Sequence, residues 1–295
     1  MPKVVARIFG GIGNQLFCYA AARRLALVNN IELVLDHKSG FENDYMFQRH
    51  YQLDHFSIPC RKASCAERLE PMPRLRRYLL KLLNSRRPFE MRKYIMQEGL
   101  DFDERLLSIN PIGTLYLDGY WQSERYFQDI NSTIRKDLLI KTPKDKLNHL
   151  TANKIRSCQA VAIHIRFFDS PFERKGGNLS ESYYSRAIAK MEKMVPDARY
   201  FVFSDQPHFA LDNVTLPSDR MTIVTHNHGD QNAYADLWLM TQCQYFIIAN
   251  STFSWWGAWL STAQNKIVIA PDPKFMPCDN YWRTVGIIPD NWFLL

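Results

Sequence analysis

The sequence predicts an α/β protein made of two domains, each with a parallel sheet. Short apolar or β-branched segments alternate along the chain with segments of helical periodicity, which is typical of strands joined by helical crossovers. A length of 295 residues also exceeds what one hydrophobic core usually serves. The expected strands are 4–9, 31–35, 115–117, 161–165, 200–203, 221–224, 245–249 and 267–270, and the expected helices are 14–28, 181–194, 232–243 and 254–262.

A polar segment at 141–149 separates two sets of expected strands and predicts the join between the domains. We place the boundary near residue 155, which gives a domain of residues 1–155 and a domain of residues 156–295.

Composition indicates a globular protein with anionic partners. Hydrophobic residues make up 46% and charged residues 23% of the chain, and the net charge is +7 with a pI near 9.0. Nucleic acid, a membrane surface or a sugar nucleotide would each match that charge.

The cysteines and the chain start indicate a reducing compartment. The six cysteines include no C-x-x-C pair and no zinc-type His spacing. The first residues lead into a glycine turn without an apolar signal segment, and no uncharged apolar run reaches about 18 residues. We therefore expect a cytoplasmic protein.

The segment 71–94 predicts a basic amphipathic helix followed by a loop. Its apolar residues share one helical face and are surrounded by basic residues from Arg74 to Lys93. Either this face covers a local core, or the helix docks on an anionic membrane or a phosphate-bearing acceptor.

The segment 247–260 predicts an anion site. An apolar strand runs into a turn of small hydroxyl residues and then into an aromatic-rich helix. The hydroxyls of Ser251, Thr252 and Ser254, the free N–H groups of the first turn and the helix dipole all suit a phosphate group. The tryptophans that follow are expected to pack and hold this helix start in place.

A glycine turn near the start of the chain lies between a strand and a helix. Gly10, Gly11 and Gly13 let the backbone approach a ligand closely. Leu16 occupies the sixth position of G-x-G-x-x-G counted from Gly11, and a Walker lysine is missing, so NAD or ATP binding is not expected. A purely structural turn leaves the polar pair after Gly13 without an explanation.

The strand that opens the second half carries His164 and Arg166 on one face, near its C-terminal end. Ligands of open parallel sheets bind at that end. Arg166 could contact a diphosphate in a bidentate manner and hold its charge as a leaving group departs. Taken alone, His164 also fits a core position and Arg166 a structural ion pair.

Two more polar positions lie beside expected strands. Ser204 and Asp205 end a strand and suit a nucleobase or ribose, but they equally suit the cap of the next helix. Asp236 could accept hydrogen bonds from a ligand or satisfy the adjacent turn.

Two metal-like patterns have simpler interpretations. Asp101 and Asp103 match D-x-D, but no clear strand precedes them and acidic residues are common at helix starts. His226 and His228 lie in a polar loop without a clear third ligand.

The order of these motifs resembles glycosyltransferase family 11, the α-1,2-fucosyltransferases. The resemblance rests on 10–17, His164 to Arg166, 203–205, 236–240 and 250–256, and it spans nearly the whole chain. It implies a GT-B-like fold of two Rossmann-like domains facing a cleft, with the donor bound by the second and the acceptor site shaped by the first. It further implies GDP-fucose as donor, inversion at the fucose anomeric carbon, and no required metal or other cofactor.

The resemblance assigns roles to the residues that match the family motifs. Arg166 and Asn14 are candidate catalytic residues, and Asp169 and Glu173 are the candidate carboxylate bases. The donor-binding candidates are Gly11, Gly13, His164, Arg166, Ser204, Asp205, Asp236, Asn250, Ser251, Thr252, Phe253 and Ser254.

One departure from the family pattern matters. The family usually continues His-x-Arg-Arg-Gly-Asp, whereas Phe167 and Phe168 stand here in place of the second arginine and the glycine. We hypothesise that Arg166 bears more of the diphosphate charge, while the aromatic pair packs inward or lines the sugar pocket. The assignment of Asp169 is weakened by the missing glycine, which leaves Glu173 or a water as the alternative base.

The leading hypothesis is a cytoplasmic α-1,2-fucosyltransferase of surface polysaccharide or O-antigen synthesis, peripheral on the membrane through Arg74 to Lys93, with a galactose-terminated or lipid-linked glycan as acceptor. A GT-B-type transferase that uses another sugar nucleotide or linkage is the nearest rival. A non-catalytic RNA- or polyanion-binding protein is a distant one, because no RNA-binding motif is recognisable.

Overall fold

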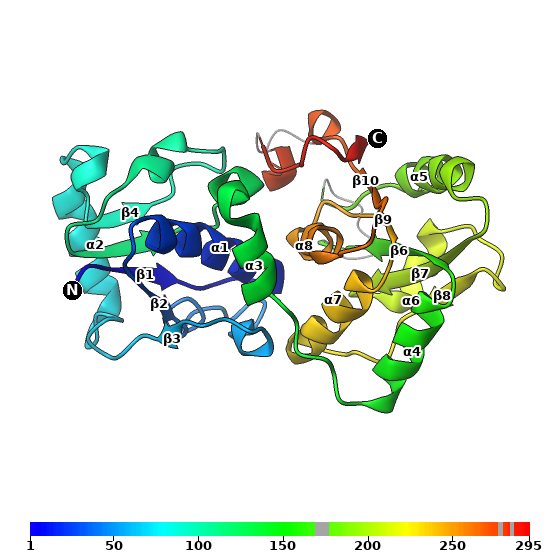
Figure 1. Ribbon diagram of the computed structural model, residues 1–295, viewed down its shortest axis with the longest axis horizontal. Coiled ribbons are helices and arrows are strands. Elements are labelled where there is room, and N and C mark those ends of the chain that lie inside the picture. Colours follow the sequence, from blue (N-terminus) through cyan, green and yellow to red (C-terminus); the bar gives the residue numbers. More distant parts are fainter. Residues whose placement is uncertain (169–176, 277–279, 284–285) are drawn as a thin grey trace. The chain divides into compact units, whose positions relative to one another are not determined.

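The computed structural model describes residues 1–168, 177–276, 280–283 and 286–295, and the chain forms two compact α/β units (Figure 1). The N-terminal unit runs from Met1 to Ile140 and takes in Ile287, and the C-terminal unit begins at Lys141. The division falls ahead of the expected position near residue 155. The reason is helix α4 (Lys146–Arg156), which packs on β6 (Gln159–Ile165) and α7 (Ala233–Thr241) of the C-terminal unit.

The N-terminal unit is built on a five-stranded parallel sheet of order β3-β2-β1-β5-β4. Helix α1 packs on β1 and β2, and α2 lies against β4. The strands are β1 (Lys3–Arg7), β2 (Glu32–Asp36), β3 (Arg61–Lys62), β4 (Tyr94–Met96) and β5 (Thr114–Asp118), and the helices are α1 (Ile12–Val28), α2 (Pro73–Ser85) and α3 (Asn131–Asp137).

The C-terminal unit is built on a six-stranded parallel sheet of order β11-β10-β9-β6-β7-β8. From β6 the chain moves outward to β7 and β8, and then returns to the other side of β6 for β9, β10 and β11. This is the strand order of a Rossmann fold, and its switch point lies between β6 and β9. The remaining elements are β7 (Ala198–Ser204), β8 (Met221–Ile223), β9 (Tyr245–Ile247), β10 (Ile267–Ala270), β11 (Phe293–Leu294), α5 (Glu181–Met194), α6 (Pro207–Ala210) and α8 (Thr252–Leu260).

Alternation along β6 sends its side chains to two different layers. Val161, Ile163 and Ile165 join the core beneath α5. The period of two places His164 on the opposite face, where its ring lies 5.2 Å from that of Phe253 in α8. Helices therefore cover both faces of this sheet.

Helix α8 is held against α7 by close packing. Trp255, Trp256 and Trp259 are buried and contact one another, which confirms their expected packing role. Gly257 allows the approach, because a Cβ there would lie 3.0 Å from Cε and 3.1 Å from Cβ of Met240 in α7.

Helix α2 forms where the sequence predicts it, but its orientation contradicts the interpretation as a cover over a local core. Leu75, Tyr78, Leu79, Leu82 and Leu83 are exposed. Among the described residues, no helix is long and apolar enough to span a bilayer.

Candidate functional site

Polar residues of the C-terminal unit gather at the ends of three neighbouring strands. Arg166 follows β6, Asp205 follows β7, and Asn250 lies just beyond β9. Since β6 pairs in parallel with both β7 and β9, these ends share one edge of the sheet. That edge, beside the switch point, is where such sheets bind ligands.

Two contacts hold Arg166 at this edge, and a third fixes its partner Asp205. Its Nη1 donates to Oδ2 of Asp205 over 2.5 Å, and its guanidinium carbon lies 5.3 Å from the centroid of the Phe168 ring. Asp205 also accepts from the backbone N–H of Phe167 over 3.1 Å. Within the described part of the chain, Nε and Nη2 of Arg166 donate to no protein acceptor. A fixed cation therefore keeps donors for a ligand.

The aromatic pair that departs from the family pattern has two separate tasks. Phe167 packs inward against the core of the C-terminal unit, as we hypothesised for this pair. Phe168 lies against the guanidinium of Arg166, and its backbone N–H donates to Oδ1 of Asn178 over 2.7 Å. The ring therefore supports the one cation of the His-x-Arg motif.

His164 lies beneath Arg166 and is 4% exposed. Burial, with a smaller contribution from the charge of Arg166, lowers the pKa of His164 to about 3. The imidazole is therefore neutral near pH 7 and adds no positive charge to the site. Its Nδ1 has no hydrogen-bond partner among the residues that the structure describes.

Two tyrosines of α5 that the sequence reasoning missed hold the strand ends. Tyr184 donates its hydroxyl to the carbonyl of His164 over 3.2 Å, and Tyr183 donates to the carbonyl of Ile248 over 2.7 Å. Burial raises the pKa of both phenols, so both remain protonated donors. The only sequence signal was their adjacency on the expected helix 181–194, which did not reveal what they contact.

The start of α8 differs in detail from the predicted hydroxyl cluster. Ser251 is the N-cap residue, but its side chain makes no capping hydrogen bond with the described residues. Ser254 is fully buried and donates to the carbonyl of Ser251 over 3.2 Å, so its hydroxyl serves the helix itself. Asn250 donates to the carbonyl of Gly177 over 3.0 Å, and Thr252 and Phe253 form the first turn. The helix start faces the strand ends with its N-terminal backbone.

Ser204 and Asp236 have protein partners in this structure. Oγ of Ser204 accepts from the backbone N–H of Gln206 over 3.0 Å, which shapes the turn before α6. Asp236, in the first turn of α7, accepts from Nδ2 of Asn227 over 2.8 Å, and burial raises its pKa to about 7. The contacts of Asp236 are to the loop after β8 and not to the Arg166–Asp205 pair.

In the N-terminal unit, the glycine turn connects β1 to α1 as predicted. Gln15, fully buried, donates to the carbonyls of Gly10 over 2.9 Å and His50 over 2.8 Å. Oδ1 of Asn14 accepts from Nε2 of Gln122 over 2.9 Å. The polar pair is thus explained in part by the fold: Gln15 ties the turn to a loop, whereas Asn14 stands at the head of α1 beside Gln122.

The fold requires a glycine at position 10 but not at position 11. Gly10 has φ of +75°, and a Cβ there would lie 3.0 Å from Nδ2 of Asn14 and 3.2 Å from Cε1 of Tyr120. Gly11, at the N-cap of α1, would place a Cβ where no heavy atom of the described chain lies within 4 Å. The fold needs the first glycine, while the second leaves open space beside the backbone.

We expect Gly11→Ala to lower the sugar transfer that the family resemblance implies while leaving thermal stability nearly unchanged, because the added methyl meets a ligand and not the protein. Gly10→Ala should instead cost on the order of 1–2 kcal/mol of stability, from left-handed strain and crowding. Thermal melting and steady-state transfer kinetics on both variants check this. Full activity of a stable Gly11→Ala protein contradicts the idea that a ligand approaches this backbone.

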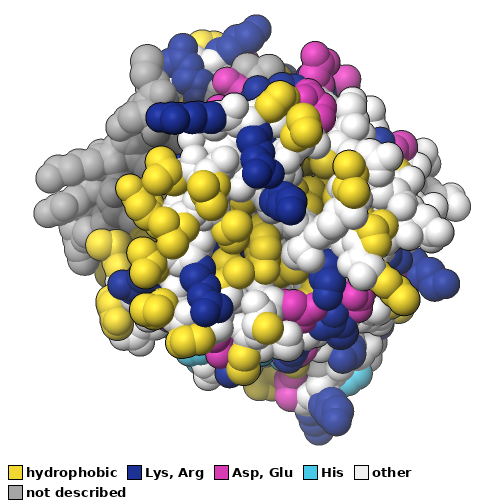
Figure 2. Space-filling model, turned by 90° about the vertical axis from the view of Figure 1, so that its left-hand side faces the viewer, with side chains coloured by type: hydrophobic (Ala, Val, Ile, Leu, Met, Phe, Trp, Pro, Cys, Tyr) yellow, Lys and Arg dark blue, Asp and Glu magenta, His cyan; other side chains and the backbone are white. Residues whose placement is uncertain are grey.

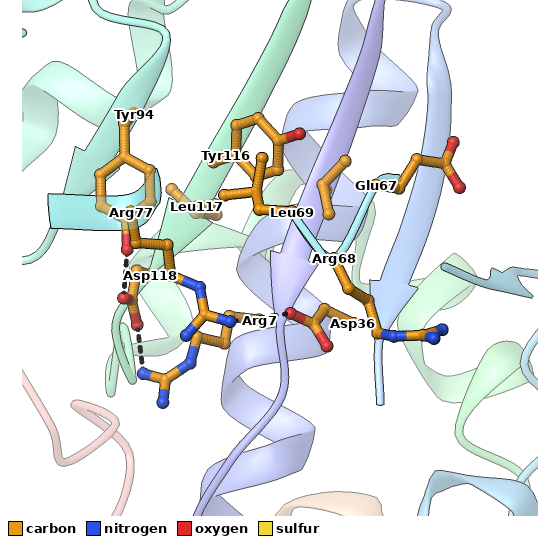
Figure 3. A pocket seen from close by; sticks show the side chains of 11 residues that line it. Arg7, Asp36, Glu67, Arg68, Leu69, Arg77, Tyr94, Tyr116, Leu117 and Asp118 are labelled. Carbon is orange, nitrogen blue, oxygen red and sulfur yellow. Dashed lines mark hydrogen bonds and ion pairs between the residues drawn. The ribbon is translucent and has the colours of Figure 1, made fainter. Parts of the chain in front are cut away.

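A charged pocket lies on the face of the N-terminal sheet that is turned away from α1 (Figure 3). Arg7 pairs with Asp118 over 3.1 Å, and Arg77 of α2 lies 3.9 Å from Asp36. Figure 3 shows these four side chains gathered together below Leu69, while the guanidinium of Arg68 points away from them. Arg77 thus joins α2 to the ends of the strands, although its Nη2 is buried without a hydrogen-bond partner among the described residues.

Comparison with known proteins identifies the family. The sequence model described as glycosyl transferase family 11 matches residues 83–282. The chain belongs to glycosyl transferase family 11.

Relatives of this family 11 glycosyltransferase include two Escherichia coli proteins matched over most of their length. An α-1,2-colitosyltransferase is 29% identical, with 96% of this chain and 98% of the relative covered. The O-antigen biosynthesis glycosyltransferase WbnK is 30% identical, with 90% and 93% covered. A Caenorhabditis elegans galactoside 2-α-L-fucosyltransferase is 29% identical over 52% of this chain and 44% of that protein.

Solved structures confirm the predicted GT-B-like α/β fold of two parallel-sheet units. A mutant of Arabidopsis thaliana FUT1 in complex with GDP superposes with a TM-score of 0.57 at 12% identity, covering 98% of this chain and 74% of that chain. A NodZ α-1,6-fucosyltransferase soaked with GDP-fucose gives a TM-score of 0.51 at 16% identity, covering 91% and 94%.

The remaining predicted residues of this glycosyltransferase are the two candidate bases and the metal-like patterns. Asp169 and Glu173 lie outside the described residues. Asp103 caps a short helix through the N–H of Arg105 and pairs with its side chain over 2.7 Å. Nε2 of His226 lies 3.1 Å from Oδ1 of Asn148, in the loop network that includes Asn227.

Proposed function

We propose that this glycosyltransferase moves L-fucose from GDP-β-L-fucose to the 2-hydroxyl of a terminal galactose, with inversion at the anomeric carbon. One observation supports the proposal most: the guanidinium of Arg166 is fixed and keeps unused donors at the C-terminal end of β6, two residues after His164, whose ring lies 5.2 Å from that of Phe253 at the start of α8. The 2-α-fucosyl and α-1,2-colitosyl activities named for relatives favour an α-1,2 linkage, and the fucosyltransferases of the same fold favour a GDP-linked donor.

The physical argument concerns the leaving group. As the glycosidic bond breaks, negative charge grows on the GDP diphosphate while the sugar takes on oxocarbenium character. Nε and Nη2 of Arg166 can meet two phosphate oxygens, while Asp205 and Phe168 keep the guanidinium in place. The N–H groups and dipole at the start of α8 add fixed positive potential at the same edge. We propose that these groups replace a metal, so no cofactor is required.

Other site residues shape the donor pocket in this proposal. Ser204, Asp205 and the 250–253 segment surround the nucleotide, Asp236 is a further candidate, and neutral His164 offers a hydrogen bond without charge. The acceptor hydroxyl attacks from the opposite face of the sugar, assisted by a carboxylate, for which Asp169 and Glu173 are the candidates. Asn14, a candidate catalytic residue, and the donor-binding candidates Gly11 and Gly13 belong to the N-terminal unit; we assign the rest of that unit to the acceptor side.

A second donor is favoured by a specific observation. One relative that spans nearly the whole chain is named a colitosyltransferase, and colitose is fucose without its 3-hydroxyl. A site that hydrogen-bonds the 3-hydroxyl would reject GDP-colitose strongly, whereas an apolar contact there would accept it.

The test is a donor panel with defined products. GDP-fucose, GDP-colitose, GDP-mannose and UDP-galactose are each offered with galactose-terminated glycans, with and without EDTA, and products are analysed by mass spectrometry and linkage NMR. We expect transfer from GDP-fucose to the galactose 2-hydroxyl, unchanged by EDTA. Preference for GDP-colitose selects the second donor, another linkage contradicts the proposed acceptor position, and a reversible loss with EDTA contradicts the metal-free mechanism.

The relative named for O-antigen biosynthesis supports a role in surface polysaccharide assembly. We propose cytoplasmic action on a galactose-terminated glycan, free or carried on a lipid.

A further inference from the structure

Helix α2 of the N-terminal unit is amphipathic in the reverse sense to an ordinary surface helix. A surface helix normally turns its apolar stripe to the core and its polar stripe to water. In α2 the positions directed to the protein are 73, 77, 80 and 84, spaced as one helical stripe, and two of them are Arg77 and Asn84. The opposite stripe is apolar and exposed: Leu75 49%, Tyr78 62%, Leu79 45%, Leu82 56% and Leu83 65%.

Polar contacts fix this orientation. Asn84 is 3% exposed, and its Oδ1 accepts from the backbone N–H of Lys93 at the start of β4 over 2.6 Å. Arg77 reaches into the charged pocket toward Asp36 (Figure 3), and Arg76 donates to the carbonyl of Glu70 over 2.9 Å. Turning the leucines inward would break these contacts and move Arg77 and Asn84 to the solvent side, so the apolar stripe stays outside.

The charge of the chain is concentrated around the same stripe. Residues 71–94 contain eight Lys and Arg and one acidic residue, Glu90, so they carry the whole net charge of +7, and the rest of the chain has equal numbers of acidic and basic residues. Arg74 and Lys81 flank the stripe on one side, and Arg76 flanks it on the other. Arg74, Lys81, Arg86 and Arg87 make no ion pair with any described residue.

The space-filling view agrees with this distribution. Figure 2 faces the side of the N-terminal unit on which α2 lies in Figure 1, and it shows hydrophobic side chains interspersed with Lys and Arg side chains. An exposed leucine and tyrosine stripe bordered by unpaired cations matches the surface of an anionic bilayer, where leucines enter the acyl boundary and cations meet lipid phosphates.

We propose that α2 is an interfacial anchor that docks this glycosyltransferase on an anionic phospholipid bilayer. The helix lies in the plane of the membrane with Leu75, Leu79 and Leu82 inserted and the flanking arginines at the headgroups. Docking would hold the enzyme where acceptors on lipid carriers are found. The inference does not depend on the identity of the sugar donor, since membrane binding is measured without one.

The test is flotation of the full chain with vesicles. Wild-type protein should float with phosphatidylglycerol vesicles and not with phosphatidylcholine vesicles. Raising the ionic strength from about 0.1 M to about 1 M should weaken binding, because the Debye length falls from ~10 Å to ~3 Å. The double variant Leu79→Glu with Leu82→Glu should bind at least roughly tenfold more weakly, because it removes inserted apolar area and adds negative charge.

A matched control is available on α4. Leu147 and Leu150 have the same spacing and are 57% and 54% exposed, so Leu147→Glu with Leu150→Glu makes the same chemical change on another helix. This control should float like the wild type. Both double variants should keep wild-type melting temperatures and wild-type transfer to a soluble galactoside, which separates loss of docking from loss of function.

Three results would overturn the proposal. One is failure of the wild type to float with phosphatidylglycerol vesicles. Another is equal behaviour of the α2 and α4 variants. The third is self-association of the wild type, seen by sedimentation velocity without vesicle binding and abolished by the α2 variant, which would make a second copy of the chain the occupant of this face.

Discussion

Replacing Arg166 with alanine is expected to lower kcat for sugar transfer by about 10²-fold or more, with a smaller effect on KM. In the proposed mechanism, charge on the diphosphate grows as the bond to the sugar breaks, so a fixed guanidinium stabilises the transition state more than the bound donor. With Phe167 and Phe168 in place of the second arginine and glycine of the family pattern, no second cation of the motif shares this task.

The environment of Arg166 allows a series of variants with graded losses of activity. Arg166→Lys keeps the charge but loses the planar fork, so we expect a loss smaller than for alanine, roughly tenfold. Asp205→Asn keeps the shape of the partner but removes the charge that orients Nη1, and it should cost less than Arg166→Ala. Arg186→Ala, an exposed arginine on α5, is the control and should behave as the wild type.

Steady-state kinetics with GDP-fucose, alongside circular dichroism melts, measure this series. Asp205 keeps solvent contact with its side chain 27% exposed, so the alanine variant should remain folded. A folded Arg166→Ala protein with near-wild-type kcat would show that the diphosphate charge is met elsewhere, and the mechanism proposed above would then be wrong.

The strands and helices that frame the site could be predicted because local and tertiary signals agree. The expected helix 181–194 matches α5 (Glu181–Met194), and the strand expected at 267–270 matches β10 (Ile267–Ala270). Both have a clear period or an unbroken apolar run that burial then reinforces. The edge strands β3 (Arg61–Lys62) and β11 (Phe293–Leu294) are too short to leave such a pattern.

Helix α4 was missed for a different reason. Its sequence is polar, with Asp145 as N-cap accepting from the N–H of Asn148, and Leu147 and Leu150 stay exposed. Few residues of α4 are buried, among them Ala152 and Ile155, so its apolar stripe is narrow. A polar segment at an expected domain boundary is interpreted as a linker unless the N-cap residue of its helix is recognised.

The places of the candidate site residues in the fold could be predicted from the sequence, but their partners could not. Parallel strands deliver their C-terminal ends to one edge, so Arg166 and Asp205 were both expected there, each with an alternative role. That they form an ion pair with each other depends on which strands are neighbours. The hydroxyl of Ser254 and the phenol of Tyr184 illustrate the same limit, since their choice between ligand and backbone is made by tertiary packing.

Helix α2 shows what hydrophobic periodicity cannot predict, which is the direction in which an apolar face points. The pattern places Leu75, Leu79 and Leu82 on one face, and it does so correctly. It does not say whether that face meets the core or the solvent, because both arrangements have the same period. The inward contacts of Arg77 and Asn84 decide the matter, and neither contact is visible in the sequence.

Asp236→Asn is expected to stabilise the protein above neutral pH, by on the order of 2–4 kcal/mol. Burial raises the pKa of Asp236 from 3.8 to about 7 in the folded protein. As pH rises past the unfolded value, the unfolded chain releases this proton while the folded protein holds it. The contribution of Asp236 to the free energy of unfolding therefore falls between about pH 4 and about pH 7 and is level above that range. Asparagine stays neutral and keeps the oxygen that accepts from Asn227.

Urea unfolding followed by tryptophan fluorescence measures this change in stability. Six of the seven tryptophans belong to the C-terminal unit that contains Asp236, so the signal reports on the unfolding of that unit. The advantage of the variant over the wild type should be larger at about pH 8 than at about pH 5, by about 2 kcal/mol. Asp212→Asn, an exposed position in the same unit, is the control and should give no such difference.

The same variant decides between the two roles left open for Asp236. If the carboxylate serves only the Asn227 loop, the stabilised variant keeps transfer activity, because its hydrogen bond to that loop survives. If the carboxylate also binds the donor, KM for GDP-fucose rises while stability increases, the trade-off expected where a charge is buried for function. An equal stability difference at both pH values would mean that Asp236 is solvated in the folded protein, and the argument from burial would then fail for this residue.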